Sequence, residues 1–262
     1  AVELTAAGMQ LLQAVAQALP RIDTAVRQIR QSAGRRQVTV TTFASFASMW
    51  LIPRLEAFQR EFADIDIRVD ASDVAVDLEV TDVDVAVRYA RAERMPPGAL
   101  RMFGESVTPM ASPWLLKSGP PLKQPTDVLG HTLIEAADAY TPHLEWLTWR
   151  RWLDTHGMAR AQPKRWLSFN YAYQMTQAAL SGQGIVLARP PLVAESLARG
   201  ELVEVFPATR LHSPMAYWLL LAPRSAQRPE VKAFADWLSA QAVATREVTG
   251  EGVDSDLVND LD

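Results

Sequence analysis

The stretch VTVTTFASFASMWLIPRLEAFQREFADIDIRVDA, residues 38–71, contains the pattern that decides the fold. It begins with alternating Val and Thr, as in a strand, and continues with apolar residues at helical spacing before a second strand-like run. Strands that alternate with helices through short links favour a parallel sheet with right-handed crossovers. The sequence therefore predicts an α/β fold, with strands at 38–42, 65–71 and 83–89 and helical segments at 45–62 and 76–80.

A second α/β unit is predicted after the Pro- and Gly-rich loop at 95–98. Its Gly182-Gln183-Gly184 run precedes a strand and not a helix, so Gly182 is expected to end a helix and the run is not expected to bind phosphate. The predicted strands of this unit are 106–111, 131–134, 166–169, 185–188, 202–206 and 217–222. Its predicted helices are 144–156, 173–181, 191–198, a short one from Pro113 and a last one from Pro229.

A long helix is predicted for residues 4–34, with Thr5 as its N-cap. Its apolar residues are separated by alternating steps of three and four, which is the a/d pattern of a coiled coil: Leu12, Val15, Leu19, Ile22, Val26 and Ile29. Pro20 lies in this stripe and is expected to kink it. So narrow a stripe favours pairing with a second helix, although packing on the same chain is the alternative.

Composition argues against several classes of function. The chain has 262 residues, a net charge of −4 and no cysteine, so its bulk charge does not attract DNA and thiolate chemistry is excluded. No apolar run is long enough to span a membrane, and no signal peptide is visible. The four histidines lack metal-binding spacing, and no common catalytic motif stands in its proper context. We therefore expect no enzyme activity, no metal and no cofactor.

Several motifs, in order along the chain, resemble those of LysR-type transcription regulators. LTAAG, residues 4–8, is similar to the LTxAG signature that closes their winged helix-turn-helix, and the following helix resembles their dimerising linker helix. Three more stretches, at 43–58, 82–89 and 178–185, resemble parts of their effector domain. AYWL, at 216–219, resembles the branch that contains the glycine-cleavage activator and the β-lactamase regulator. The resemblance covers about residues 1–242.

This resemblance implies a two-lobed effector domain, like a type II periplasmic binding protein, preceded by a long linker helix. The implied divisions are 1–36 for the end of the winged helix-turn-helix and the linker helix, 37–107 with 208–242 for lobe I, 108–207 for lobe II, and 243–262 for an acidic, disordered tail. The resemblance further implies a cytoplasmic regulator that binds a small-molecule effector, forms homodimers and tetramers, and contacts DNA through an N-terminal head expected to be missing here. A free periplasmic solute-binding protein, which would be monomeric in solution, is the alternative.

Two loops are expected to contact the effector. In the fold that the resemblance implies, a ligand lies where strands end and helices begin, because free backbone N–H groups and the helix dipole favour an anion there. The candidates are Thr42, Phe43, Ala44 and Ser45 in lobe I and Asn170, Tyr171 and Ala172 in lobe II. The plain alternatives are ordinary helix N-caps formed by Ser45 and by Asn170.

Three more residues are expected at the same cleft. Arg88 and Arg189 each end a strand, and the prolines after Arg189 fix its backbone. The hydroxyl of Tyr217, near the start of another strand, is the third candidate. For Arg88 an interlobe salt bridge is the alternative role, and for Tyr217 a place in the core. Ala90 stands where the family usually has glycine, so the shape of the pocket is expected to differ in detail.

Overall fold

The structure is a computed structural model that describes residues 5–12, 14–16, 19, 36–74, 76–137 and 145–251. Its strands form one sheet in the order β2-β1-β3-β9-β4-β7-β5-β6, and β8 pairs with β4 at the side. The strands are β1 Arg36–Thr42, β2 Ile65–Ala71, β3 Val85–Ala90, β4 Leu100–Ala111, β5 Thr132–Ala136, β6 Arg165–Phe169, β7 Ile185–Ala188, β8 Val203–Glu204 and β9 Leu211–Leu221.

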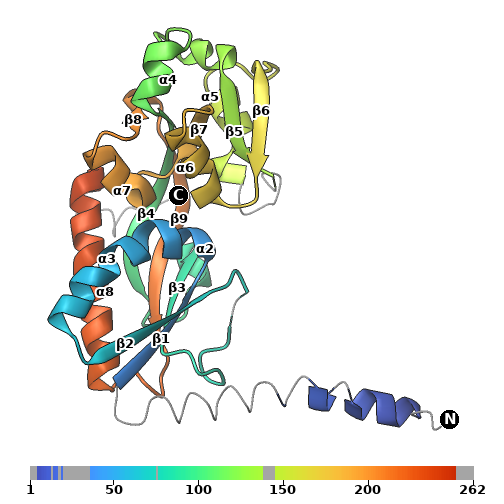
Figure 1. Ribbon diagram of the computed structural model, residues 1–262, viewed down its shortest axis with the longest axis vertical. Helices are drawn as coiled ribbons and strands as arrows, with labels where there is room; N and C mark the ends of the chain where they lie inside the picture. Colours follow the sequence, from blue (N-terminus) through green and yellow to red (C-terminus); the bar gives the residue numbers. More distant parts are fainter. Residues whose placement is uncertain are drawn as a thin grey trace.

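The sheet has two halves, and β4 passes from one to the other (Figure 1). In the first half, β1 lies parallel to β2 and β3, as the sequence predicts, and β9 then pairs antiparallel with both β3 and β4. In the second half, β5 lies parallel to β6 and β7, and β7 pairs antiparallel with β4. The partner of β4 changes from β9 at Val107 to β7 at Thr108. We call the two halves, with their helices, the first and second lobes.

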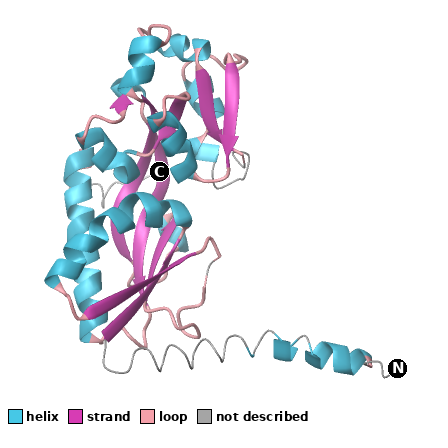
Figure 2. Ribbon diagram, in the orientation of Figure 1, coloured by secondary structure: helices cyan, strands magenta, loops and turns pink. Residues whose placement is uncertain are grey.

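Helices flank the strands in both lobes (Figure 2). In the first lobe, α2 Ala44–Phe46, the π turn η1 Ala47–Leu51 and α3 Ile52–Glu61 form one continuous helical segment, and α8 Pro229–Thr249 lies against β1 and β4. The second lobe contains α4 Pro113–Ser118, η3 Pro125–Gly130, η4 Glu145–Leu147, α5 Trp149–Thr155, α6 Ala172–Leu180 and α7 Pro190–Ala198. The short turns η2 Ala92–Arg94 and η5 Pro207–Thr209 complete the elements. None of the described helices combines the length and the apolar run needed to cross a bilayer.

Aromatic side chains fill the core of the first lobe. Phe46 stacks on Trp50 at 4.8 Å between ring centroids, and Phe58 meets Phe234 of α8 at 5.1 Å. The indole Nε1 of Trp50 donates a 3.0 Å hydrogen bond to Thr245 Oγ1, so α8 is bonded to the first helical segment as well as packed on it. A separate apolar cluster around Trp149 and Trp152 fills the second lobe, and these rings meet edge to face at 5.3 Å.

The N-terminal helix agrees with its prediction over the part that the structure describes. Residues 6–12, 14–16 and 19 are helical, and the N–H of Gly8 donates to Thr5 Oγ1 at 3.1 Å, which confirms the predicted N-cap. Leu12, Val15 and Leu19 of the apolar stripe are exposed. The remaining stripe positions and Pro20 lie outside the described residues.

Some predicted element boundaries are wrong. The helix predicted over 144–156 is two pieces, because Thr148 Oγ1 accepts the N–H of Arg151 and starts α5 afresh. The segment 76–80 holds a single turn and no helix among its described residues, and the strand predicted over 202–206 is reduced to β8. The predicted tail 243–262 begins too early, since α8 continues to Thr249 and buries Thr245. Residues 252–262 lie outside the described part.

Candidate functional site

A cavity of about 460 Å³ opens between the two lobes and is lined by both. The first lobe contributes Phe43 after β1, Ser45 in α2, and Arg88 and Tyr89 from the end of β3. The second lobe contributes Asn170, Tyr171 and Ala172 before and within α6, and Val186, Leu187, Ala188 and Arg189 from β7 and beyond it. Strand ends and helix beginnings thus meet at this cavity, which is the arrangement that favours ligand binding in α/β folds.

The loop after β1 reaches the cavity through two of its four predicted residues. Phe43 is the N-cap residue and has no side-chain capping bond, so the ordinary capping role considered for Ser45 is not what this serine does. Ser45 Oγ instead accepts the N–H of Tyr173 at 3.4 Å, across the boundary between the lobes. Thr42 is completely buried and does not line the cavity, and neither does Ala44.

The loop before α6 brings all three of its predicted residues to the cavity. Tyr171 occupies the N-cap position without a side-chain capping bond, so Asn170 is not the helix cap that the alternative assumed. Tyr171 stacks on Tyr173 with 5.6 Å between ring centroids. The helix α6 therefore begins at this side of the cavity without a capping side chain of its own, and the N–H of Tyr173 in its first turn is bonded by Ser45 of the other lobe.

Arg88 is held within the first lobe. Its Nη1 donates to the carbonyl oxygen of Thr41 at 3.2 Å, and its Nη2 donates to Thr41 Oγ1 at 3.3 Å. Burial lowers the pKa of Arg88, against the opposing effect of Asp70 and Asp73. Because these bonds run to the neighbouring strand β1, Arg88 stiffens the cavity wall, and with the described residues it does not form the interlobe salt bridge considered from the sequence.

Arg189 belongs to a buried polar cluster behind the cavity. Its Nε lies 3.6 Å from Glu105 Oε2, and its guanidinium carbon lies 5.5 Å from the centroid of the Tyr89 ring. Tyr217 Oη donates a 2.5 Å hydrogen bond to the same Glu105 oxygen, and Tyr89 Oη lies 3.2 Å from Ser213 Oγ. Tyr217 is completely buried and does not line the cavity. It is therefore a core residue, which was the alternative considered from the sequence.

Burial dominates the electrostatics of this cluster. It raises the pKa of the Glu105 carboxyl to about 7, even though Arg189 and the Tyr217 hydroxyl oppose the shift. It also raises the pKa of the Tyr89 and Tyr217 hydroxyls, with Glu105 adding to both shifts. For Arg189, burial lowers the pKa of the guanidinium, but Tyr217 and Glu105 outweigh burial and raise it overall. Arg189 is therefore a cation at any physiological pH, whereas Glu105 is poised between its two forms.

Sequence reasoning missed several residues of the site. Ser72 and Asp73 line the cavity after β2, as Phe43 does after β1, so the rule that parallel strands end at one edge would have found them. Leu147 and Thr148 also line it, from a segment predicted as continuous helix. Glu105 carried little signal, because it precedes the strand predicted at 106–111 and β4 also contains the polar residues Arg101, Ser106 and Thr108.

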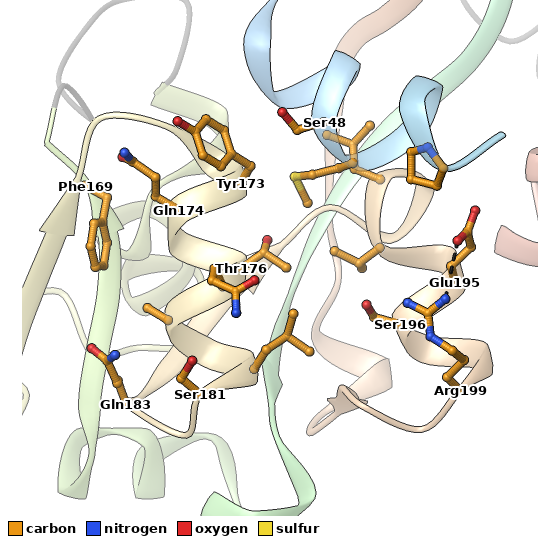
Figure 3. A pocket seen from close by; sticks show the side chains of 17 residues that line it. Ser48, Phe169, Tyr173, Gln174, Thr176, Ser181, Gln183, Glu195, Ser196 and Arg199 are labelled. Carbon is orange, nitrogen blue, oxygen red and sulfur yellow. Dashed lines mark hydrogen bonds and ion pairs between the residues drawn. The ribbon is translucent and has the colours of Figure 1, made fainter. Parts of the chain in front are cut away.

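A second, larger cavity of about 640 Å³ lies between the first helical segment of the first lobe and α6 and α7 of the second, so it too is lined by both lobes. Figure 3 shows Thr176 of α6 on the side of Ser196 and Arg199 of α7, and Gln174 beside Phe169; Glu195 and Arg199 are paired at 3.5 Å. None of the predicted site residues lines it, and its arginine is already paired with acidic side chains. We regard the smaller cavity as the functional one, because the ends of strands from both lobes and a largely buried arginine meet there.

The described residues contain no group of three or more metal-binding side chains close enough to hold an ion. Two histidines have structural partners: His131 Nε2 lies 3.0 Å from the carbonyl oxygen of Pro120, and His156 Nδ1 lies 2.6 Å from that of Trp152. His143 lies outside the described residues. What remains at the cavity is a set of hydroxyls, amides and arginines suited to holding a small polar molecule.

Fold and cavity together define a two-lobed ligand-binding domain. The LysR substrate binding domain family matches residues 31–243. The chain therefore belongs to the LysR family of transcription regulators, and it is the effector-binding part of such a regulator and not a free periplasmic binding protein. This confirms the family, the fold class and the general function expected from the sequence.

Relatives and solved structures agree with this assignment. The glycine cleavage system transcriptional activator of Escherichia coli K12 is 30% identical over 244 residues, which are 93% of this chain and 77% of the relative. The transcriptional activator AmpR of Pseudomonas aeruginosa is 29% identical over 240 residues, 91% of this chain and 77% of AmpR. The solved AmpR effector domain from Pseudomonas aeruginosa, 29% identical, superposes with a TM-score of 0.60 over 82% of this chain and 98% of that domain. CrgA of Neisseria meningitidis, 20% identical, has a TM-score of 0.61 over 92% of this chain and 80% of CrgA, which supports the fold alone.

Proposed function

We propose that the cavity between the lobes binds a small metabolite, and that binding changes the angle between the lobes and so the DNA-binding region of the regulator. The observation that carries this proposal is that the ends of strands from both lobes meet at this cavity, with Phe43 and Arg88 on one side and Asn170 and Arg189 on the other. A ligand that contacts both lobes binds unequally to their open and closed arrangements. That difference in affinity is the condition for a ligand to shift a conformational equilibrium.

Two contacts across the boundary support a movement of this kind. One is the hydrogen bond from the Tyr173 N–H to Ser45 Oγ. The other joins Arg91, which follows β3, to the Trp146 ring of η4 at 5.8 Å, while Arg151 packs on the same ring at 4.0 Å. Ser45 lines the cavity, so a ligand bound there is placed to compete with the first contact.

The role that we propose is binding without catalysis. The cluster behind the cavity has one carboxylate, one arginine and two tyrosines, and it offers no nucleophile paired with a base. We also infer that the regulator acts in the cytoplasm and pairs as a homodimer through the exposed stripe of the N-terminal helix, with tetramers formed by contacts between lobes. Lobe boundaries at 37–107 with 208–249, and at 108–207, agree with the change of partner along β4.

The test is a thermal-shift screen of metabolites against the wild-type chain and two serine variants. Ser45→Ala is expected to weaken binding of any stabilising compound at least threefold and to leave the unliganded melting temperature within about 2 °C, since its Oγ bond is long at 3.4 Å. Ser48→Ala is the matched control, because Ser48 lies on the same helical segment but lines the other cavity. A ligand at a hundredfold excess over its Kd stabilises by about 2.7 kcal/mol, which such a screen detects easily.

The outcomes separate the two cavities. If Ser48→Ala weakened binding and Ser45→Ala did not, the cavity of Figure 3 would be the effector site and our assignment would be wrong. A stabilising compound indifferent to both substitutions would equally contradict the assignment.

A further inference from the structure

The ion pair between Arg189 and Glu105 is incomplete. Their closest atoms are 3.6 Å apart, beyond hydrogen-bond distance, although the Glu105 side chain is completely buried and that of Arg189 is 16% exposed. Glu105 Oε1 has no hydrogen-bond partner among the described residues, although the backbone N–H of Ser106 lies close enough to influence its pKa. The oxygens of a buried carboxylate normally accept hydrogen bonds. This pair lacks such bonds, so an exchange of partners by Arg189 breaks none between the two side chains.

We infer that an anionic group of the cavity ligand takes Arg189 from Glu105, and that Glu105 takes up one proton from solvent as the anion binds. This inference rests on the proposed function and adds to it the chemical class of the ligand, an anion such as a carboxylate. Arg189 lines the cavity and is open to it on one side, while Glu105 lies behind it on β4. An anion in the cavity can therefore reach Arg189, whereas Glu105 is not among the residues that line the cavity.

Two negative charges around one buried arginine are unfavourable. A like charge nearby disfavours the ionised form of a carboxyl group. When Arg189 bonds the ligand, its positive charge also stabilises the ionised form of Glu105 less than before. The Tyr217 hydroxyl can remain the donor to Oε2 in either form of Glu105, so protonation needs no rearrangement in the core. Protonated Glu105 then leaves Arg189 free to bond the ligand.

The surroundings of Glu105 contain few other charges. Tyr217 of β9, Arg189 before α7 and Glu251 after α8 act on it, and it acts in turn on Tyr89 of β3. Burial already raises its pKa to about 7, and Glu251 adds to that rise. A modest further rise on anion binding is enough to protonate Glu105 at neutral pH. Tyr89 and Tyr217 stay neutral there, because the pKa of each hydroxyl is raised.

Arg88, the other arginine of the cavity, is unsuited to this exchange. It donates three hydrogen bonds to backbone and hydroxyl oxygens of Thr41 and Val87, and Asp70 and Asp73 already act on its charge. An anion at Arg88 would have to break those bonds, whereas an anion at Arg189 replaces a contact of 3.6 Å.

Acetate and the neutral acetamide are suitable probes at constant ionic strength. With the Glu carboxyl carbons labelled with carbon-13, NMR titration of the whole chain follows the protonation of Glu105 directly, and Glu105→Gln identifies its signal. Saturating acetate is expected to raise the Glu105 midpoint by at least one pH unit, and acetamide is expected to leave it unchanged. Above pH 7 the Kd for acetate should rise with pH, by a total factor of about ten for each pH unit by which acetate raises the Glu105 midpoint, which is the linkage expected for uptake of one proton.

Variants make the assignment specific. Glu105→Gln imitates the protonated form, so it should bind acetate more tightly and without this pH dependence. In Arg189→Gln acetate should have no effect on Glu105, whereas Arg189→Lys should keep part of the effect. Arg199→Gln, a change at an exposed arginine on the other cavity, is the control and should behave as wild type.

The inference is overturned if acetate leaves the Glu105 midpoint unchanged, or if Glu105→Gln keeps the pH dependence. Neither result would touch the proposed function, which fails separately if no metabolite stabilises the wild-type chain in the thermal-shift screen. If Glu105→Gln did not fold, the comparison of Arg189→Gln with Arg189→Lys would decide the question alone.

Discussion

Two neighbouring threonines at the end of β1 differ in what their hydroxyls do. Both are completely buried, but Thr41 Oγ1 accepts a hydrogen bond from Arg88 Nη2, while Thr42 Oγ1 has no partner among the described residues. A buried hydroxyl without a partner costs stability, whereas one that bonds a charged group contributes to it. Thr42 was predicted to contact the effector, but it is buried and does not line the cavity. Its hydroxyl therefore bears on stability.

Thr42→Val is therefore expected to stabilise the domain by up to about 1 kcal/mol and to leave effector binding unchanged, because valine has nearly the same shape and lacks the hydroxyl. Thr41→Val is the matched change and should destabilise by about 0.5–1.5 kcal/mol, since Arg88 loses an acceptor. Urea unfolding of both variants measures the difference. Equal losses in the two would show that the Thr42 hydroxyl has a partner after all.

Glu105 gives stability a characteristic dependence on pH. Its carboxyl binds a proton more tightly when folded, with a pKa of about 7 that burial raises above the ordinary value of 4.5. The folded state therefore holds more protons between pH 4.5 and 7, and this group's contribution to the free energy of unfolding falls as pH rises across that window, by up to about 1.4 kcal/mol per pH unit. Glu105→Gln should remove this fall. Unfolding free energies of wild type and variant at pH 5, 6 and 7 check it, and parallel curves would refute it.

At the scale of elements, the end of α6 follows its sequence signal closely. Gly182 has φ of 74°, its N–H donates to Ala179 and the next N–H, of Gln183, donates to Ala178. This pair of bonds is the Schellman motif, and glycine is favoured in it because other residues avoid positive φ. Gly182 also supports the ring of Trp114 from α4, since an added Cβ would lie 2.5 Å from Trp114 Cε3.

Gly182→Ala is therefore expected to destabilise by more than the backbone strain alone. Gly200→Ala is the control, because Gly200 has a similar φ of 68° but an added Cβ would meet nothing within 4 Å. Strain at positive φ should cost about 1–2 kcal/mol in both. Gly182→Ala should cost at least about 1 kcal/mol more, measured by thermal or urea unfolding, and equal costs would mean that Trp114 moves aside freely.

Local signals explain which elements the sequence could predict. Strand alternation over 38–42 and apolar spacing over 45–62 mark β1 and the first helical segment correctly. The π turn within that segment was not predicted; it comes just before Pro53, whose ring would crowd the carbonyl of Met49 in a regular helix. The early part of β4 and of β9 was also missed, because these residues form strands by pairing with each other across more than 100 positions of sequence, which no local pattern records.

The residues of the site likewise fall into those that local sequence signals could predict and those that they could not. Residues that follow strands, such as Phe43 and Asn170, were found because their position follows from the order of elements. The order of elements does not determine the direction in which a side chain points. Thr42 and Tyr217 were therefore predicted to line the cavity, although both are buried and neither lines it. Glu105 matters only through its contacts with Arg189 and Tyr217, and those exist only in the folded molecule.

At the scale of the whole molecule, the order of strands constrains the order in which the chain can fold as it is synthesised. The strands β5, β6 and β7 of the second lobe are complete before β9 and α8 of the first lobe have left the ribosome. Until then β3 has an open edge where β9 will pair, and the first helical segment lacks its contact with α8. Because open strand edges invite pairing with other chains, the newly made first lobe is the half most exposed to aggregation, and the last elements made are the ones that close it.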